Sequence, residues 1–161
     1  MTNHLRGALI GLAVGEALGA DVEFSSPGSF APVTGYRSGG PHRLNPGEWT
    51  DDTRMALALA DSIATVGWDL NDQASRYVEW MKHGKYSVNG RCFDVGITTS
   101  RALHKFIESG DASQSGSRSE SASGNGSIMR LAPVPIRYAG HNPDNIEELS
   151  RLADEMSKAV C

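Results

Sequence analysis

Apolar side chains recur at helical spacing along most of the chain, and no segment shows the alternation typical of a half-buried strand. The most apolar segment is residues 7–20. Within and just before it, one helical face carries Leu5, Leu9, Leu12 and Glu16. This spacing predicts an N-terminal helix with one side turned toward the protein interior.

Four glycines form a second stripe on this predicted helix, at positions 7, 11, 15 and 19. Glycine in a helix interior costs about 1 kcal/mol relative to alanine. A stripe free of side chains allows another helix to approach closely, which would compensate for that cost. We therefore expect a buried helix that is tightly packed along its glycine face.

Four further helices are predicted from apolar spacing and from start signals near Thr50, at Asp69, after Asp94 and at Asn142-Pro143. The first three of them are expected to end at Gly67, Gly84 and Gly110. Their predicted inner faces comprise Met55, Leu59, Ile63, Val66, Ala74, Tyr77, Val78, Met81, Thr98, Ala102, Leu103, Phe106, Ile107, Ile146, Leu149, Leu152, Ala153 and Met156. The sequence thus predicts a compact, multi-helix, all-α domain over residues 1–161.

Two segments lack helical periodicity. Residues 25–49 are interrupted by many glycines and prolines and are expected to form a long loop. Residues 109–127 are rich in serine and glycine, and serine alternates without an apolar face, so a flexible loop is favoured over a strand. A short apolar element, residues 128–135, then follows and is expected to end at its prolines.

Composition narrows the functional classes. The 161 residues carry a net charge of −4, which argues against a nucleic-acid binder with a broad basic surface. The apolar segment 7–20 contains an acid and is shorter than the about 20 residues that span a bilayer, so no membrane association is expected. Cys92 and Cys161 fit neither a disulfide framework nor a zinc motif, which favours a reducing, cytoplasmic location. The histidines, at positions 4, 42, 83, 104 and 141, show no paired metal spacing and are interpreted as surface or polar-core residues.

A first candidate for chemistry is Thr50, Asp51 and Asp52, three consecutive oxygen-bearing side chains where a helix is predicted to begin. A hard cation such as Mg²⁺ prefers oxygen ligands, and these side chains would supply about half of its shell. The alternative is structural: Thr50 caps the helix and the two acids complement the helix dipole.

A second candidate is Gly124-Asn125-Gly126, which leads into Ser127 and a short apolar element. Glycines at such a position let backbone N–H groups approach an anion closely, and Arg130 would add positive charge. The alternative is a tight turn that ends the serine-rich stretch.

Four stretches resemble motifs of the ADP-ribosylglycohydrolase family, and they occur in the family's order. They are Arg6 to Gly19, Trp49 to Ala60 (WTDDTRMALALA), Cys92 to Thr99 (CFDVGITT) and Gly124 to Arg130 (GNGSIMR). One such match would be weak evidence, whereas four in order identify the chain as similar to this family.

The resemblance implies an all-α domain with two Mg²⁺ ions and assigns roles to individual residues. It makes Thr50, Asp51 and Asp52 metal ligands, and it places Glu23 and Asp94 at the reacting bond as catalytic residues. It further implies a substrate-binding loop formed by Gly124, Asn125, Gly126, Ser127 and Met129. From the residues alone, Glu23 could equally be a solvated loop carboxylate and Asp94 the N-cap of the following helix.

The chain departs from the family pattern in one respect, because it lacks the second acidic motif, Asp-x-Asp-Thr, that closes the family's metal site. Its later acids, Asp144, Glu147, Glu148, Asp154 and Glu155, fit the exposed face of an ordinary helix. We expect the sequence to be the N-terminal part of a domain truncated at its C-terminal side, whether as a fragment, a short paralogue or a chain whose other half is separate. Exposed core faces would then favour a homo-oligomer or a complementing C-terminal fragment.

The function that the resemblance implies is Mg²⁺-dependent hydrolysis of the glycosidic bond between ADP-ribose and a protein side chain or related acceptor. The expected partner is an ADP-ribosylated protein or a small molecule that contains ADP-ribose. The alternative is a non-catalytic ADP-ribose-binding or crystallin-like structural relative that is inactive because the second acidic motif is absent.

Overall fold

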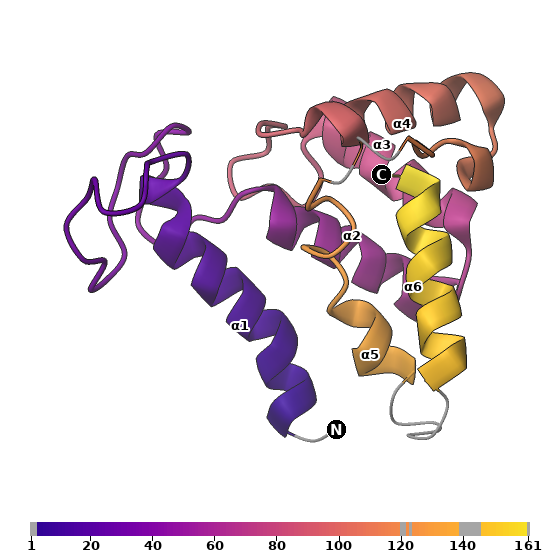
Figure 1. Cartoon of the computed structure of the whole chain (residues 1–161), viewed down its shortest axis with the longest axis horizontal. Helices are drawn as coiled ribbons and strands as arrows, with labels where there is room; N and C mark the ends of the chain where they lie inside the picture. The colour runs from indigo at the N-terminus through magenta and orange to yellow at the C-terminus, as the bar shows by residue number, and fades with distance from the viewer. Residues whose placement is uncertain (1–2, 120–121, 123, 139–145, 161) are drawn as a thin grey trace.

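The computed structural model describes residues 3–119, 122, 124–138 and 146–160. Within them the chain is helical and contains no strand, only an isolated bridge between Gly39 and Leu44. The elements are α1 (Asn3–Gly19), η1 (Ala20–Val22), α2 (Asp51–Thr65), α3 (Leu70–His83), α4 (Ile97–Ser109), η2 (Ala112–Gln114), α5 (Pro133–Tyr138) and α6 (Ile146–Val160), where η marks one turn of 3₁₀ helix (Figure 1). The predicted all-α fold is confirmed.

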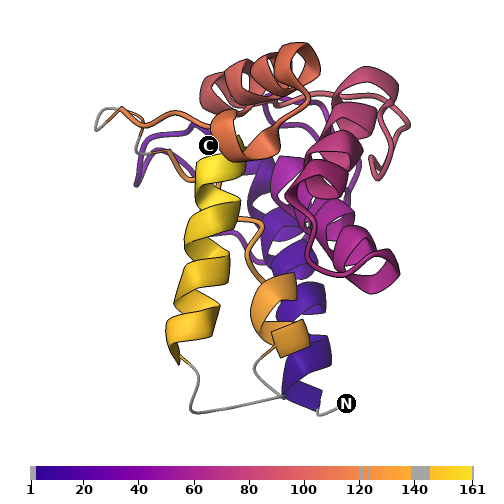
Figure 2. The same cartoon turned by 90° about the vertical axis from the view of Figure 1, so that its right-hand side faces the viewer.

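Helix α2 lies centrally and contacts α1, α3 and α5, while α6 packs against α3, α4 and α5 (Figures 1 and 2). The core is built from the inner faces of α2, α3, α4 and α6 and comprises Met55, Ala58, Leu59, Ile63, Ala74, Tyr77, Trp80, Ala102, Leu103, Ala112, Val134, Leu152, Met156, Ala159 and Val160. Most predicted inner-face positions therefore contribute. Val66, Ile107 and Ile146 were wrongly predicted, since they are 55%, 42% and 71% exposed near the ends of their helices, where no neighbour covers them.

Local signals set three helix ends as expected. The Asp69 side chain accepts hydrogen bonds from the backbone N–H groups of Asn71 and Asp72, at 2.9 and 3.0 Å, and so caps α3. Gly84 and Gly110 end α3 and α4 in the left-handed conformation, with φ of 68° and 71°. The predicted start at Asn142-Pro143 lies outside the described residues.

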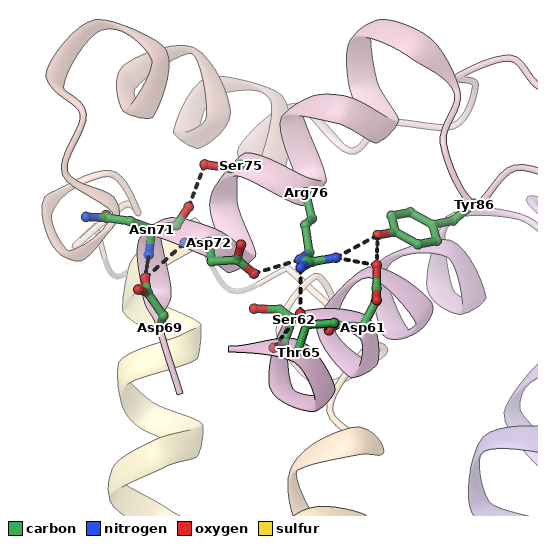
Figure 3. Close-up of polar contacts among 9 residues, drawn as sticks. All are labelled: Asp61, Ser62, Thr65, Asp69, Asn71, Asp72, Ser75, Arg76 and Tyr86. Atoms are coloured by element: carbon green, nitrogen blue, oxygen red, sulfur yellow. Dashed lines mark hydrogen bonds and ion pairs between the residues drawn. The ribbon is translucent and has the colours of Figure 1, made fainter. Parts of the chain in front are cut away.

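A polar network centred on Arg76 fastens α3 to α2 (Figure 3). The Arg76 guanidinium pairs with Asp72 at 2.6 Å on its own helix, with Asp61 on α2, and donates to Thr65 Oγ1 at 2.7 Å. The Tyr86 hydroxyl, from the loop after α3, donates to Asp61 at 2.6 Å. Because the guanidinium is mostly buried and bonds to both helices, it fixes their relative position as well as adding to their stability.

The expected tight packing along the glycine face of α1 is wrong for the part of the chain that the structure describes. A Cβ atom added at Gly7, Gly11, Gly15 or Gly19 would meet no atom within 4 Å, and Ala17 is the one buried residue of α1. The neighbours approach a different face, since Leu9 lines an apolar groove of about 340 Å³ with Ile63 of α2 and Ile136 of α5. The glycine stripe therefore stays open.

The serine-rich segment is partly anchored where it is described. Ala112 of η2 is fully buried, and its N–H donates to the Asn71 side chain at 2.9 Å. The Gly116 N–H donates to the Lys158 carbonyl at 3.1 Å, which joins the segment to α6. Residues 109–119 thus form no strand, as expected, but their first half packs on the core. The predicted flexibility of residues 109–127 stays a prediction, and positions 120, 121 and 123 lie outside the described residues.

The prolines after residue 130 were expected to end an apolar element, but they open one. Helix α5 begins at Pro133, and Pro135 lies within its first turn. First-turn N–H groups have no partner within a helix, so proline loses nothing there and its fixed φ favours the helical conformation. None of the helices described combines the length and apolar character needed to cross a membrane.

We predict that Gly84→Ala lowers the unfolding free energy more than Gly110→Ala does. Both substitutions introduce backbone strain, and the first also introduces a steric overlap. Both glycines have positive φ, which costs an alanine about 1–2 kcal/mol. A Cβ at Gly84 would also overlap the backbone of Gly90 and Arg91, whereas Gly110 faces open space. Urea denaturation should therefore show a larger loss of unfolding free energy for Gly84→Ala, by about 1–3 kcal/mol. Equal losses would mean that the loop at Gly90 moves aside freely.

Candidate active site

One cavity of about 430 Å³ collects most of the residues that the sequence singled out. Its wall comes from the loop after η1, the first turn of α2, the loop before α4 and the loop before α5. The predicted site residues on this wall are Glu23, Asp51, Asp52, Asp94, Gly124, Asn125, Gly126 and Met129. Segments separated by as many as 100 positions in the sequence therefore meet at one place, and Ser127, although described, does not line the cavity.

The N-terminus of α2 is capped by Glu16, a residue of α1. One carboxylate oxygen of Glu16 accepts from the Thr50 N–H at 2.9 Å, the Thr50 hydroxyl at 2.6 Å and the Asp52 N–H at 3.1 Å. The other oxygen accepts from the Thr53 N–H at 3.0 Å and from the Thr53 hydroxyl. Thr50 is the N-cap residue but its side chain caps nothing, so the predicted threonine cap is replaced by a carboxylate. A carboxylate suits this place because helix N–H groups and the helix dipole favour negative charge.

This arrangement aims Asp51 and Asp52 away from the cap and into the cavity, close to other acids. Ligand oxygens of Glu16, Asp51 and Asp52 lie within 4.8 Å of one another. Burial, followed by the nearby charges of Asp94 and Asp52, raises the pKa of Asp51 to about 8. Burial and the charges of Glu16 and Asp94 raise the pKa of Asp52 to about 6. The site therefore concentrates acidic groups, and among the described residues no neighbouring cation offsets the rise in their pKa values.

Thr50 faces a smaller adjoining cavity of about 220 Å³, whose wall also includes Glu16, Glu23 and Asp52. Thr50 is only 3% exposed, so its hydroxyl oxygen lies within this acidic surrounding. A threonine hydroxyl and carboxylates are the oxygen donors that hard cations prefer. The chemistry of the donor set thus fits a divalent cation.

His42 lies between two other carboxylates that line the cavity. His42 Nε2 is 3.3 Å from Glu23 Oε2 and 3.2 Å from Asp94 Oδ2. Burial, and next the Asp94 charge, raises the pKa of Glu23, while His42 opposes that rise. Asp94 does not cap α4, as one interpretation had it, because Gly96 is the N-cap residue and Asp94 adopts a positive φ of 60° two residues earlier. Its carboxylate is therefore free to line the cavity.

Arg54 connects two of the segments that carry these acids. Its guanidinium is fully buried, donates to the carbonyls of Trp49 and Phe93 at 2.9 and 3.1 Å, and lies 3.5 Å above the Phe93 ring. It thereby ties the residue before Thr50 to the residue before Asp94. Burial lowers the pKa of this guanidinium, and the surrounding acids oppose the effect.

One minor prediction is corrected by the structure. Arg130 was expected to add charge near the glycine loop, but it is fully buried, donates to the Met156 carbonyl at 3.3 Å and lies over the Tyr77 ring. The core needs its long stem between α3 and α6, so its charge does not reach the cavity. Cys92 is half-buried, and burial raises the pKa of its thiol, which disfavours the reactive thiolate.

Comparison with known proteins agrees with these motifs. The model of the ADP-ribosylglycohydrolase family matches residues 1–159. The chain belongs to the ADP-ribosylglycohydrolase family. An ADP-ribosylarginine hydrolase, Tri1, of Pseudomonas putida (strain GB-1) is 48% identical over 135 residues, which is 83% of this chain and 36% of that protein. The ADP-ribosyl-[dinitrogen reductase] glycohydrolase of Rhodospirillum rubrum is 39% identical over 143 residues, 86% of this chain and 46% of that protein.

The fold agrees as well. A solved structure of an ADP-ribosylglycohydrolase-related protein complex superposes with a TM-score of 0.76 at 39% identity, covering 98% of this chain and 51% of that one. This member of the ADP-ribosylglycohydrolase family therefore spans between about a third and a half of the length of these relatives.

Two residues of the site were not singled out from the sequence. Glu16 was placed on the inner face of α1 among leucines, and an acid in such a stripe was the available signal that it has a buried partner. His42 lies in the long loop 25–49, and no local pattern connects it to Glu23 or Asp94. Both act through residues that are distant in sequence.

Glu16→Gln is predicted to destabilise the fold and to lower the pKa of Asp52. A glutamine amide offers one acceptor oxygen and places its NH₂ group against N–H donors, so unfolding free energy should fall by about 2–3 kcal/mol. Loss of the Glu16 charge removes one cause of the raised Asp52 pKa. Urea denaturation and carboxyl NMR titration measure the two effects, with the exposed Glu108→Gln as the matched control. A stability equal to that of the control would contradict the capping role.

The raised pKa values also predict how stability depends on pH when no cation is added. Asp51 and Asp52 hold protons up to about pH 8 and 6 in the folded chain, whereas an unfolded aspartate releases its proton near about pH 3.9. The folded state therefore binds more protons between these values, and its stability should fall as pH rises from 5 to 8. Asp51→Asn should flatten this slope in urea denaturations run at each pH. A slope that stays unchanged in this variant would assign the effect to other groups.

Proposed function

We propose that this chain carries the catalytic cavity of a Mg²⁺-dependent hydrolase that cleaves the glycosidic bond between ADP-ribose and an arginine side chain of a protein. The supporting observation is that one cavity joins the acidic start of α2, the pair Glu23 and Asp94, and the loop Gly124–Gly126. Relatives named as an ADP-ribosylarginine hydrolase and an ADP-ribosyl-[dinitrogen reductase] glycohydrolase favour the same reaction.

Thr50, Asp51 and Asp52 are the residues that would hold Mg²⁺. The raised pKa values of the two aspartates support this assignment, because a divalent cation would neutralise charge that the chain itself leaves uncompensated. When bound, the metal would supply positive charge that orients and polarises the ribose hydroxyls.

Glu23 is the group suited to move a proton. Hydrolysis adds water across the bond between the anomeric carbon and the guanidino nitrogen, so one proton leaves the water and one reaches the departing nitrogen. Glu23 is half-buried with a raised pKa, which suits a carboxyl group that accepts the first proton and returns one to the leaving group. Asp94, on the same wall, would hold the guanidino group in place.

The loop at Gly124–Gly126 would bind the diphosphate of ADP-ribose. The Asn125 carbonyl accepts from the N–H groups of Ile128 and Met129, at 3.0 and 3.1 Å, which closes the loop into a compact turn. Among the described residues, a Cβ added at Gly124 would meet nothing within 4 Å, so there is open space beside this glycine. Exposed backbone N–H groups in such a turn favour anions.

The charge of the cavity favours a cationic acceptor. Among the described residues that line it, four are acidic and none is basic. A guanidino group would be attracted to this surface, whereas a neutral acceptor such as a serine oxygen would gain less from it. Arginine is therefore the acceptor that we propose.

A second candidate is a protein that binds ADP-ribose without cleaving it. It is favoured by the positions of the later acids, because Glu148 and Glu155 pair with Arg151, and Asp154 pairs with Lys158, on the face of α6. Within the described residues, no further pair of carboxylates faces Asp51 and Asp52. A cation would then be held from one side only.

Calorimetry and a hydrolysis assay distinguish these candidates. Asp51→Asn and Asp52→Asn should each weaken Mg²⁺ binding by at least about tenfold, since each removes one charge from the proposed shell. Asp154→Asn, a surface aspartate on α6, is the matched control. Release of ADP-ribose from an ADP-ribosylarginine peptide should require Mg²⁺, stop with EDTA, and be slow unless a C-terminal half of a relative is added. Mg²⁺ affinity unchanged in both variants would overturn the metal assignment, and ADP-ribose binding without any turnover would favour the second candidate.

A further inference from the structure

The strongest feature that the proposed function does not use is His42. It comes from the long loop between η1 and α2 and contacts two acids that line the cavity, and its side chain is 15% exposed. Its Nε2 atom is almost equidistant from Glu23 Oε2 and Asp94 Oδ2, at 3.3 and 3.2 Å. The two carboxylates come from separate loops, so this one nitrogen makes ion-pair contacts, without a hydrogen bond, to side chains from two parts of the chain.

The imidazole ring is held by residues adjacent to both carboxylates. Phe24, which follows Glu23, meets the ring edge-on with centroids 6.1 Å apart. Phe93, which precedes Asp94, lies tilted at 5.3 Å on another side. Phe93 is itself fixed by Arg54, through the contact of its ring with the guanidinium and the hydrogen bond to its carbonyl. The position of His42 is thus tied to the start of α2.

The backbone of the three segments that carry Glu23, His42 and Asp94 is also unusual near these residues. Positive φ values occur at Phe24 (59°), Arg43 (55°) and Asp94 (60°), which are cluster residues or their direct neighbours. Side chains other than glycine seldom adopt this conformation, and it persists where the surrounding contacts require it. Three separate loops therefore adopt unfavourable conformations at the point where Glu23, His42 and Asp94 meet.

We propose that His42 is a positioning residue that holds Glu23 and Asp94 together in the orientation needed for hydrolysis. Without it, two carboxylates on one wall would repel each other and move apart toward solvent. The inference rests on the proposed function for its catalytic consequence, but the geometry that it describes can be measured without substrate.

The test uses variants that separate the ring from its nitrogen. His42→Phe keeps a ring between Phe24 and Phe93 but loses Nε2, whereas His42→Gln returns a side-chain N–H group. His83→Phe and His83→Gln, at the exposed end of α3, are the matched controls. The measurements are the melting temperature, kcat and KM for an ADP-ribosylarginine peptide in the presence of Mg²⁺ and a C-terminal half of a relative, and the carboxyl ¹³C shifts of Glu23 and Asp94.

We expect His42→Phe to keep KM within about threefold while kcat falls by about 10- to 100-fold, because small displacements of reacting groups are costly. His42→Gln should recover most of kcat. Both carboxyl signals should move in His42→Phe and return in His42→Gln, with no change in the controls. If His42→Phe does not fold, His42→Asn replaces it, since its shorter amide cannot reach both carboxylates.

Carboxyl signals that stay unchanged, or a kcat that stays unchanged while the signals move, would overturn the inference. The inference would also be overturned if kcat falls in proportion to the melting temperature and His42→Gln does not restore it. That result would show that His42 contributes only to the stability of the fold. If the wild-type chain cleaves no ADP-ribosylarginine, the proposed function fails, and the carboxyl signals alone decide whether His42 holds the two acids together.

Discussion

The carboxylate of Glu16 is the interaction on which the candidate site depends. It accepts hydrogen bonds from Thr50, Asp52 and Thr53 and so fixes the end of α1 against the first turn of α2. With those N–H groups satisfied by α1, the side chains of Asp51 and Asp52 need not cap the helix and can face the cavity. The helix dipole, which favours negative charge at this end, makes the accumulation of acids tolerable.

The rest of the fold keeps this acidic first turn in place. The Arg76 network joins helix α2 to α3. Met55 and Leu59 of α2 pack in the hydrophobic core. At the start of α2, Arg54 binds the carbonyls of Trp49 and Phe93 and places a buried positive charge behind the acids. Rigid support behind a site, with charge left uncompensated at its open side, suits binding of a cation or a polar substrate.

The sequence predicted what short-range rules determine, and it did not predict what depends on distant contacts. Helical spacing, the Asp69 cap and the glycine stops gave the helices, and four motifs gave most residues of the cavity wall. The role of Glu16 depends on partners 34 to 37 positions away, and the role of His42 on a path of the 25–49 loop that no periodicity specifies. The open glycine stripe of α1 was mispredicted for the same reason, since small residues permit close packing but do not supply the neighbour.

Energetically unfavourable features of the cavity also explain why the function is assigned to it and not to the apolar groove at Leu9. Among the described residues, the groove is lined by apolar side chains and by Arg137, the one lining residue that could bind a polar ligand. The cavity instead contains half-buried acids with raised pKa values and lies beside positive φ values at Phe24 and Asp94. Such unfavourable features persist where the contacts around them are strong enough to impose them. Here those contacts are the Glu16 cap, the Arg54 contacts and the ring of His42. They involve the segments that carry the four carboxylates of the cavity, Glu23, Asp51, Asp52 and Asp94.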